Sequence, residues 1–184
     1  MMQFLKCIFQ LCYVKLKDLK MQFDVMVLHG FYLPRGSGIY HPTNITIGKN
    51  FGISQFCQLY CQDPDSGSKL IIGDDVCLNN NVLIIADHGG QITIGNKTMI
   101  GPFTVLRAAN HKFDNPNVPI VDQGHLPGVI SIEEDVWIGA HVTVLKDVNI
   151  GKSSIIGAGS IVTRDIPPYS IAVGNPARVI RSRK

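Results

Sequence analysis

Aliphatic side chains recur at every sixth residue along most of the chain from residue 47 onward. The phase restarts after short interruptions, and all fifteen positions in phase hold Ile, Leu or Val. They are Ile47, Ile53, Leu59, Ile72, Leu78, Ile84, Ile94, Ile100, Leu106, Ile132, Ile138, Val144, Ile150, Ile156 and Val162. A period of six fits neither the 3.6-residue repeat of an amphipathic helix nor the two-residue alternation of a plain hairpin. The pattern predicts a repeating series of short strands, each followed by a corner.

Two further regularities accompany the aliphatic position. The next residue is glycine at seven places, and we expect these glycines to let the backbone adopt corner conformations that a Cβ would resist. They are Gly48, Gly73, Gly95, Gly101, Gly139, Gly151 and Gly157. Four residues after the aliphatic position stands a small or β-branched residue, which suits a pleated wall. Examples are Cys57, Val76, Val82, Thr98, Thr104, Val136, Val142, Val148, Ser154 and Ser160.

Three six-residue units return the chain above its starting point, so the aliphatic side chains stack inside a triangular prism. The sequence therefore predicts an all-β protein, a single-domain left-handed parallel β-helix. About five coils begin at residues 47, 72, 94, 132 and 150, and they rise roughly 20–25 Å at normal strand spacing. The alternative is a β-sandwich with frequent Ile-Gly turns, but a sandwich needs no fixed six-residue phase.

We assign residues 39–184 to the β-helix and residues 1–38 to an N-terminal segment that caps the coil or lies at an interface. The repeat breaks briefly at residues 63–69 and 87–91 and at length over residues 107–131. This long insertion is rich in His, Asn, Asp, Pro and Gly. Long loops on rigid scaffolds tend to carry function, so candidate chemistry is sought there first.

Composition narrows the class of protein. A chain of 184 residues that is 45% hydrophobic and 17% charged is typical of one globular domain, and a net charge of +3 does not favour nucleic-acid binding. The five cysteines include no CxxC pair. That indicates a reducing, cytoplasmic setting in which free thiols serve as small apolar side chains.

The first twenty residues interleave apolar side chains with four lysines, without a cleavage site or a span long enough to cross a bilayer. Two interpretations stay open: an amphipathic helix at a membrane surface, or a cap over the exposed end of the coil. The apolar residues are Phe4, Leu5, Ile8, Phe9, Leu11, Cys12, Val14, Leu16 and Leu19.

Three C-terminal motifs carry a family resemblance. They are Asp135-Val-Trp-Ile-Gly-Ala140, Ile156-Gly-Ala-Gly-Ser-Ile-Val-Thr-Arg-Asp-Ile-Pro-Pro-Tyr169 and Val173-Gly-Asn-Pro-Ala-Arg-Val-Ile180. Over residues 40–184 the chain resembles bacterial hexapeptide-repeat acyltransferases. It is most similar to the branch that acetylates sugars, which includes galactoside, maltose, Nod-factor and polysaccharide acetyltransferases. The resemblance implies a cytoplasmic homotrimer that transfers acetyl from acetyl-CoA to a saccharide hydroxyl. The favoured acceptor is a polysaccharide, capsule or lipopolysaccharide precursor, and weak attachment to the inner membrane face is compatible with this substrate.

The resemblance also implies a general base, His111, in the loop that enters the insertion. Imidazole titrates near working pH, and general-base assistance is worth on the order of 10²–10⁴ in rate. A surface-loop histidine without a catalytic role is the alternative. Acceptor contacts are implied for Asn81, which is also a good corner residue, and more weakly for Asp87. Two neighbours of the base, Asn110 and Asp114, are candidates for the acceptor site or for orienting the imidazole.

Coenzyme contacts are implied for a further set of residues, which includes backbone N–H groups as oxyanion donors and a C-terminal tail over residues 163–184. The set is Trp137, Gly139, Ala140, Ala158, Thr163, Arg164, Arg178 and Arg181. Guanidinium groups bind phosphate through paired donors, and Trp137 is the only tryptophan. Wall packing of the indole and a solvated basic tail are the alternatives.

Other functions remain to be weighed. The γ-class carbonic anhydrases share the coil, but they bind zinc through histidines of which two are five residues apart, whereas Pro116 follows His111 at that spacing. We therefore expect no metal. N-acetylation of an amino sugar, O-acetylation of an antibiotic and a non-catalytic coil stay open. His88, His125 and His141 are weaker catalytic candidates, and His125 is expected at a solvated loop position.

Overall fold

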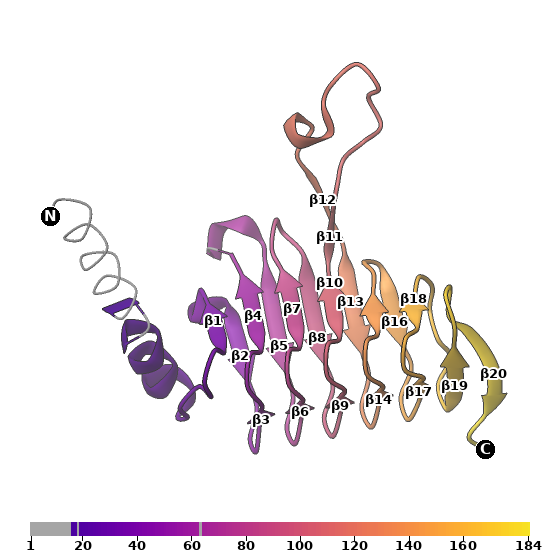
Figure 1. The fold of residues 1–184 in the computed structure, drawn as a ribbon, viewed down its shortest axis with the longest axis horizontal. Helices are drawn as coiled ribbons and strands as arrows, with labels where there is room; N and C mark the ends of the chain where they lie inside the picture. Colours follow the sequence, from indigo (N-terminus) through magenta and orange to yellow (C-terminus); the bar gives the residue numbers. More distant parts are fainter. Residues whose placement is uncertain (1–15, 18, 63) are drawn as a thin grey trace, which may run out of the picture.

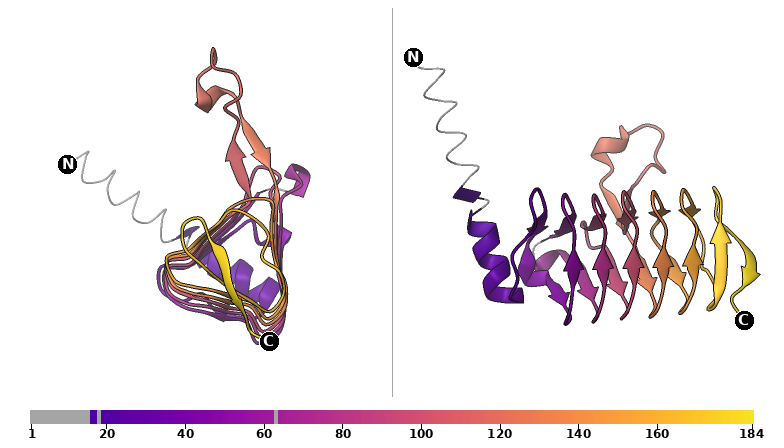
Figure 2. Two further views of the ribbon diagram at one scale, coloured as in Figure 1. Left: turned by 90° about the vertical axis from the view of Figure 1, so that its right-hand side faces the viewer. Right: turned by 60° about the horizontal axis from the view of Figure 1, so that its bottom comes forward.

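The protein forms a solenoid of short parallel strands. Its computed structural model describes residues 16–17, 19–62 and 64–184. Three parallel sheets run along the coil, one on each side of a triangular cross-section (Figures 1 and 2). The predicted parallel β-helix is therefore confirmed.

The first sheet, which we call sheet A, contains β1 Gly38–Tyr40, β4 Gln58–Cys61, β7 Leu83–Ala86, β10 Val105–Arg107, β15 Thr143–Val144 and β18 Ile161–Val162. Sheet B contains β2 Ile45–Ile47, β5 Lys69–Ile72, β8 Gln91–Ile94, β13 Val129–Ile132 and β16 Val148–Ile150. Sheet C contains β3 Gly52–Ile53, β6 Cys77–Leu78, β9 Met99–Ile100, β14 Trp137–Ile138, β17 Ile155–Ile156, β19 Ser170–Val173 and the antiparallel β20 Arg178–Ser182.

The aliphatic column forms the core of the prism. Neighbouring rungs pair in register, as in Leu78 with Ile100 and Ile138 with Ile156. Thirteen of the fifteen predicted positions are buried, and only Ile47 and Ile53 on the first rung are half-buried. Sheet A has six rungs rather than five, because its first strand, β1, lacks the Ile-Gly signature from which coils were counted.

Glycine recurs directly after the aliphatic position of the repeat for a reason that differs from the one expected. None of the seven repeat glycines is among the residues with positive φ. At Gly101 a Cβ would lie 2.6 Å from the carbonyl carbon of Gly139 on the next rung, and at Gly95 it would lie 2.6 Å from that of Glu133. Glycine is needed here because successive corners approach too closely for a side chain, so the expectation of special corner dihedrals at these positions is wrong.

The left-handed conformation falls instead three residues after the aliphatic position. The residues in this place have φ between 55° and 73°: Asn50, Phe56, Asp75, Asn81, Lys97, Phe103, Asp135, His141, Asp147, Ser153 and Gly159. Asn and Asp tolerate this region better than most residues, although Phe and Lys also occur. The corners are therefore set by the whole repeat rather than by glycine alone.

Buried hydroxyls at the small position bond to corner carbonyls. Thr104 Oγ1 donates to the carbonyl of Gly139 at 3.0 Å, and Ser154 Oγ donates to that of Pro167 at 2.9 Å. These bonds satisfy polar groups that would otherwise be costly to bury. Cys57 and Cys61 are buried free thiols, as predicted, and burial raises the pKa of both.

A helix covers the N-terminal end of the coil. Residues 16–17 and 19–29 are helical, and the helix lies over the open end of the triangle (Figure 2, left). Val25 and Leu33 are buried in the core cluster, and the Gln22 side chain holds both backbone polar groups of Leu33. Of the amphipathic pattern predicted for the first twenty residues, residues 1–15 and 18 lie outside the described residues. No helix in the described part of the chain is long and apolar enough to cross a membrane.

The three interruptions all leave the coil at the edge between sheets A and B. Two short 3-10 turns lie at the same edge: η1 Pro42–Asn44 between β1 and β2, and η2 Pro64–Ser66 between β4 and β5. The long insertion forms an antiparallel hairpin, β11 Ala109–His111 with β12 His125–Pro127, and its tip contains η3 Ile120–Asp122. The hairpin projects away from the prism (Figures 1 and 2).

Candidate active site

The site begins at the corner between β7 and β8. His88 adopts φ 50° there, and its backbone N–H donates to Gln62 Oε1, from the equivalent corner of the preceding rung, at 2.6 Å. Asp87 Oδ2 lies 3.3 Å from Arg107 Nη1 and 3.7 Å from His88 Nε2. Asp87 Oδ1 is buried and has no hydrogen-bond partner among the described residues. The corner thus holds one satisfied and one unsatisfied carboxylate oxygen.

The hairpin rises one rung further along the same edge. Gly128 N–H donates to the carbonyl of Ala108 at 2.8 Å and closes its base, while Arg107 Nε donates to the carbonyl of Ala109 at 3.1 Å. His111 is the last residue of β11 and is exposed. The predicted base therefore stands in solvent contact just above a closed strand pair, where an acceptor can reach its imidazole.

Sequence reasoning missed the residues that surround His111. Its direct partner in the hairpin register is His125, with ring centroids 4.3 Å apart and planes at 41°. On its other side His125 stacks on His88, with centroids 3.4 Å apart and planes at 5°. His125 is half-buried between two rings rather than solvated, so that expectation is wrong. The available signal was a histidine at each end of one insertion, which a hairpin brings together.

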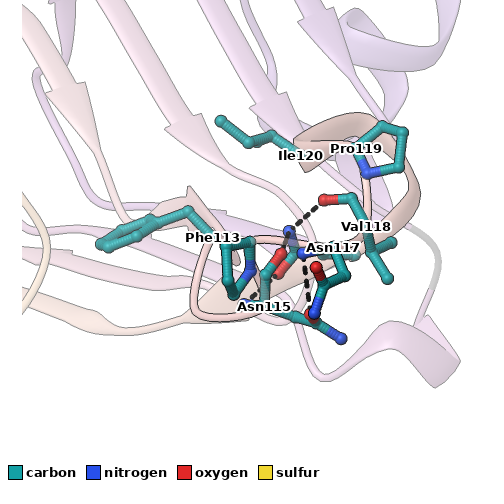
Figure 3. Close-up of a pocket in the computed structure, with 8 residues that line it drawn as sticks. Phe113, Asn115, Asn117, Val118, Pro119 and Ile120 are labelled. Atoms are coloured by element: carbon teal, nitrogen blue, oxygen red, sulfur yellow. Dashed lines mark hydrogen bonds between the residues drawn. The ribbon is translucent and has the colours of Figure 1, made fainter.

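The neighbours of His111 point to different places. Asn110 is exposed and pairs with Leu126 in the hairpin register. Asp114 is exposed beyond the strand, where the tip begins. Figure 3 shows the hollow in that tip, which Gln123 holds together by donating to the carbonyls of Asn115 at 2.9 Å and Val118 at 2.7 Å. Among the described residues, neither Asp114 nor Asn110 bonds to the His111 imidazole, and His125 is the ring that touches it.

Asn81 lies on another edge of the prism. It occupies the left-handed corner between β6 and β7, with φ 60°, and its N–H donates to the carbonyl of Gln55 at 3.0 Å. This corner joins sheets C and A, whereas Asp87 and His111 lie on the edge between A and B. Asn81 is therefore not brought to the histidines of its own chain, and the corner role accounts for its position.

Trp137 stands on the outer face of sheet C. It is 51% exposed and lies in register with Met99 on one side and Ile155 on the other. Met99 is 53% exposed. The indole is therefore part of an apolar strip on the outer wall, and packing inside the coil is excluded.

The implied oxyanion donors lie at the corner that follows Trp137. The N–H of Gly139 donates to the carbonyl of Ile156 at 2.8 Å, so this amide is already used within the coil. Ala140 is half-buried, and Ala158 is exposed at the equivalent corner of the next rung. Of the two predicted backbone donors, only the Ala140 N–H makes no hydrogen bond to another described residue, so it is the one that can donate to a ligand.

The remaining coenzyme candidates fall into two groups. Thr163 and Arg164 follow β18 on the edge between sheets A and B, two rungs beyond the hairpin base, or roughly 10 Å along the axis. Arg178 and Arg181 lie on exposed β20, where Arg181 pairs with Ile171 of sheet C. The predicted coenzyme residues are thus distributed over two edges and one wall of the C-terminal half.

Sheet A separates the two parts of the predicted site. His111 leaves the coil after β10, whereas Trp137, Ala140 and Ala158 flank the start of the sheet A strands. The five residues from the Phe103 corner to Ala108 span roughly 17 Å of extended chain. The hairpin also points away from its own prism (Figure 2, left). One chain therefore does not bring His111 to the coenzyme candidates.

A triangular coil of six-residue units defines a hexapeptide-repeat β-helix. Residues 130–164 match the family model described as bacterial transferase hexapeptide (six repeats). A hexapeptide-repeat-containing acetyltransferase from Vibrio cholerae, solved with acetyl coenzyme A, is 31% identical, with a TM-score of 0.57 over 82% of this chain and 72% of that one. The chain belongs to the hexapeptide-repeat acetyltransferase family.

Two other relatives differ in the chemistry that their names describe. Galactoside O-acetyltransferase of Escherichia coli is 41% identical over 115 residues, which are 62% of this chain and 55% of that protein. A variant of AntD, an N-acyltransferase from Bacillus cereus solved with dTDP-4-amino-4,6-dideoxyglucose and coenzyme A, is 28% identical. Its TM-score is 0.70 over 81% of this chain and 78% of that one. The chain spans 55–59% of the length of the first curated relatives it matches.

Proposed function

We propose that this protein is an acetyl-CoA-dependent O-acetyltransferase of saccharide hydroxyls, with His111 as the general base. The observation that carries the proposal is the exposed imidazole at the base of a hairpin that projects from a hexapeptide coil. A family relative of the same coil was solved with acetyl coenzyme A. A second relative is named for acetylation of a sugar hydroxyl.

The reaction is a direct transfer. The acceptor hydroxyl oxygen attacks the thioester carbonyl while a ring nitrogen of His111 takes the hydroxyl proton. The resulting oxyanion is met by the Ala140 amide, since such donors lower the barrier most when they are already in position. When the C–S bond breaks, the imidazolium returns the proton to the departing thiolate. The products are an acetyl ester and free coenzyme A, without a covalent enzyme intermediate.

The active unit is a homotrimer in which one chain supplies the hairpin and its neighbour supplies the coenzyme groove. Two observations support this: the two sets of candidates lie on different edges of one prism, and the hairpin tip is apolar. Phe113, Ile120 and Val121 are 68%, 56% and 78% exposed. Exposed apolar groups on a projecting arm suit contact with a second copy.

The coenzyme arm runs along the outer strip of sheet C. Trp137 and Met99 supply its apolar floor. Ala158 has no large side chain to obstruct the groove at the next corner. Thr163, Arg164, Arg178 and Arg181 supply polar and cationic groups for the phosphates, because guanidinium pairs well with phosphate oxygens.

A polysaccharide, capsule or lipopolysaccharide precursor is the proposed acceptor. The free oxygen Oδ1 of Asp87 is suited to accept a hydrogen bond from a sugar hydroxyl. Asn81 of a neighbouring chain, Asn110 and Asp114 are further candidates to contact it. An amino-sugar acceptor is the second candidate, and the likeness to an N-acyltransferase with a bound amino-sugar nucleotide favours it.

Acceptor screening with product analysis tests the proposal. The protein is incubated with acetyl-CoA and a panel of oligosaccharides, amino sugars and hydroxylated antibiotics, and thiol release is followed by absorbance. Products are then treated with neutral hydroxylamine, which cleaves an ester and leaves an amide. Ester formed on a neutral saccharide is the expected result. Amide formed on an amino sugar, or ester formed only on an antibiotic, would replace the proposed acceptor.

We further propose a cytoplasmic enzyme that touches the inner membrane face through its N-terminal helix. The face of the helix away from the coil exposes Leu16, Leu19, Phe23 and Val27 at helical spacing, beside Lys17 and Lys20. Such a surface suits an anionic bilayer. Full-length protein should sediment with anionic liposomes more than a version that lacks residues 1–20. Equal sedimentation would contradict membrane attachment.

A further inference from the structure

Three histidine rings from two parts of the chain are joined by two ring contacts, one stacked and one tilted. His88 belongs to a coil corner, whereas His125 and His111 belong to opposite strands of the hairpin. The rings of His88 and His125 are nearly parallel at 3.4 Å, and those of His125 and His111 are tilted at 4.3 Å. Within the described part of the chain, His125 is therefore the ring that touches both a coil corner and His111.

The lower end of the stack is fixed. Gln62 accepts from the His88 N–H at 2.6 Å, and its side-chain nitrogen lies 3.5 Å from His88 Nδ1. Asp87 faces the other ring nitrogen of His88 and is itself paired with Arg107. The His88 ring is thus held from both sides by groups that belong to the coil.

The upper end has little support of its own. A two-stranded hairpin is marginally stable alone in water. His111 is exposed, and the structure records no bond from its ring nitrogens to another described residue. A general base must be held within a fraction of an ångström and a few tens of degrees of its productive position. The stacked ring of His125 meets this need.

We propose that His125 is a positioning residue that rests on His88 and fixes the imidazole of His111 relative to the coil. This inference rests on the proposed function of His111. Stacking presents ring faces rather than converging nitrogens, and the described residues contain no group of three or more ligands arranged for a metal ion. A planar ring is therefore what position 125 must provide.

The electrostatic surroundings of His125 also favour a positioning role for this residue. Burial and the charges of His88 and His111 lower the pKa of His125, Arg107 acts in the same direction, and Asp87 opposes them. The lowered pKa favours the neutral form of the His125 ring beside His111. A neutral neighbour does not repel the imidazolium that forms on His111 when it takes the acceptor proton.

The test compares His125→Ala with His125→Phe, which keeps a flat ring, and with Leu126→Ala on the same strand as control. With acetyl-CoA and the best acceptor, His125→Ala should lower kcat about tenfold and leave KM for acetyl-CoA unchanged. His125→Phe should keep at least half of the wild-type kcat, and Leu126→Ala should match the wild type. His88→Ala should also lower kcat about tenfold. The double variant His88→Ala/His125→Ala should have a kcat no lower than that of either single variant. Equal loss in His125→Ala and His125→Phe, or no loss in either, would overturn the positioning role.

A second measurement needs no acceptor. In ¹H–¹³C NMR spectra of the histidine rings, the Cε1 signal of His111, assigned from its absence in His111→Ala, should broaden or shift in His125→Ala and be retained in His125→Phe. An unchanged His111 signal in His125→Ala would refute the inference even if catalysis by His111 stood. Conversely, a clear effect on the ring in a protein that transfers no acetyl group would leave the positioning intact and refute the proposed function.

Discussion

At the scale of single residues, spacing between rungs decides which side chains are allowed. Parallel rungs repeat at about 4.8 Å, and the corners approach more closely than the strands do. A Cβ at Gly101 would lie 2.6 Å from backbone carbon of the next rung, whereas one at Gly52 would meet its nearest neighbour, the sulfur of Cys77, at an ordinary 3.5 Å. The two glycines therefore have different roles although both lie in the coil.

This difference predicts the effect of adding one methyl group. Gly101→Ala should lower the free energy of unfolding by about 1–3 kcal/mol, because backbone must shift to admit the Cβ. Gly52→Ala should change it by less than about 0.5 kcal/mol, since the new Cβ would make only an ordinary van der Waals contact and φ is not positive. Urea unfolding followed by circular dichroism measures both. Equal stability of the two variants would contradict the assigned cause.

At the scale of elements, the hairpin is an addition to a complete coil. The bond from Gly128 N–H to the carbonyl of Ala108 closes its base, and Asp147 Oδ1 accepts from Val129 N–H at 3.1 Å where the chain re-enters sheet B. Above the base, the ring of His125 stacks on His88 and joins the hairpin to the coil. The position of His111 therefore depends on a small number of local contacts.

The contact between His125 and His88 predicts a pH dependence of hairpin docking. The pKa of His125 is lowered from 6.5, first by burial and then by electrostatic interaction with His88, His111 and Arg107, while Asp87 opposes the shift. The undocked hairpin binds the proton more readily, so the free energy of docking should be constant above about pH 6.5 and fall below it. Hydrogen exchange of the Lys112 and Gly128 amides, corrected for intrinsic rates, should be faster at about pH 5.5 than at about pH 7.5. His125→Phe should lose part of this slope, and a wild-type rate independent of pH would contradict the mechanism.

At the scale of the whole molecule, the prism keeps apart the groups that a transferase must join. His111 and Ala158 lie on different edges, and the hairpin points outward (Figure 2). The proposed site shared between copies would resolve this separation, because a closed ring of identical chains offers each hairpin to a neighbouring groove. The proposed trimer has three times the 20.2 kDa mass of one chain.

Complementation tests the shared site. His111→Ala removes the base, and Ala158→Tyr fills the groove at an exposed corner, so each protein alone should be inactive. When the two are unfolded together at equal amounts and refolded, random assembly places an intact hairpin beside an intact groove at about one interface in four. The mixture should therefore regain about a quarter of wild-type activity. A mixture as inactive as its components would contradict a site made by two chains.

The sequence predicts the coil well because its signal is redundant. Fifteen aliphatic positions follow the same six-residue step within four runs, so the errors at single corners, such as the role given to the glycines, do not disturb the fold. The first rung was missed because β1 lacks the repeat signature. The histidine stack could not be predicted, since it requires the hairpin register that pairs His111 with His125 and the left-handed corner that turns His88 toward them. Both are tertiary contacts between residues that are far apart in the sequence.

The most direct test of the account is the steady-state rate of acetyl transfer by His111→Ala beside the wild type, with thiol release measured at saturating acetyl-CoA and acceptor. If His111 is the base, kcat falls by a factor of about 10²–10⁴, while the circular dichroism spectrum and KM for acetyl-CoA stay the same. A variant that transfers acetyl at the wild-type rate would contradict the assignment of His111 as the base.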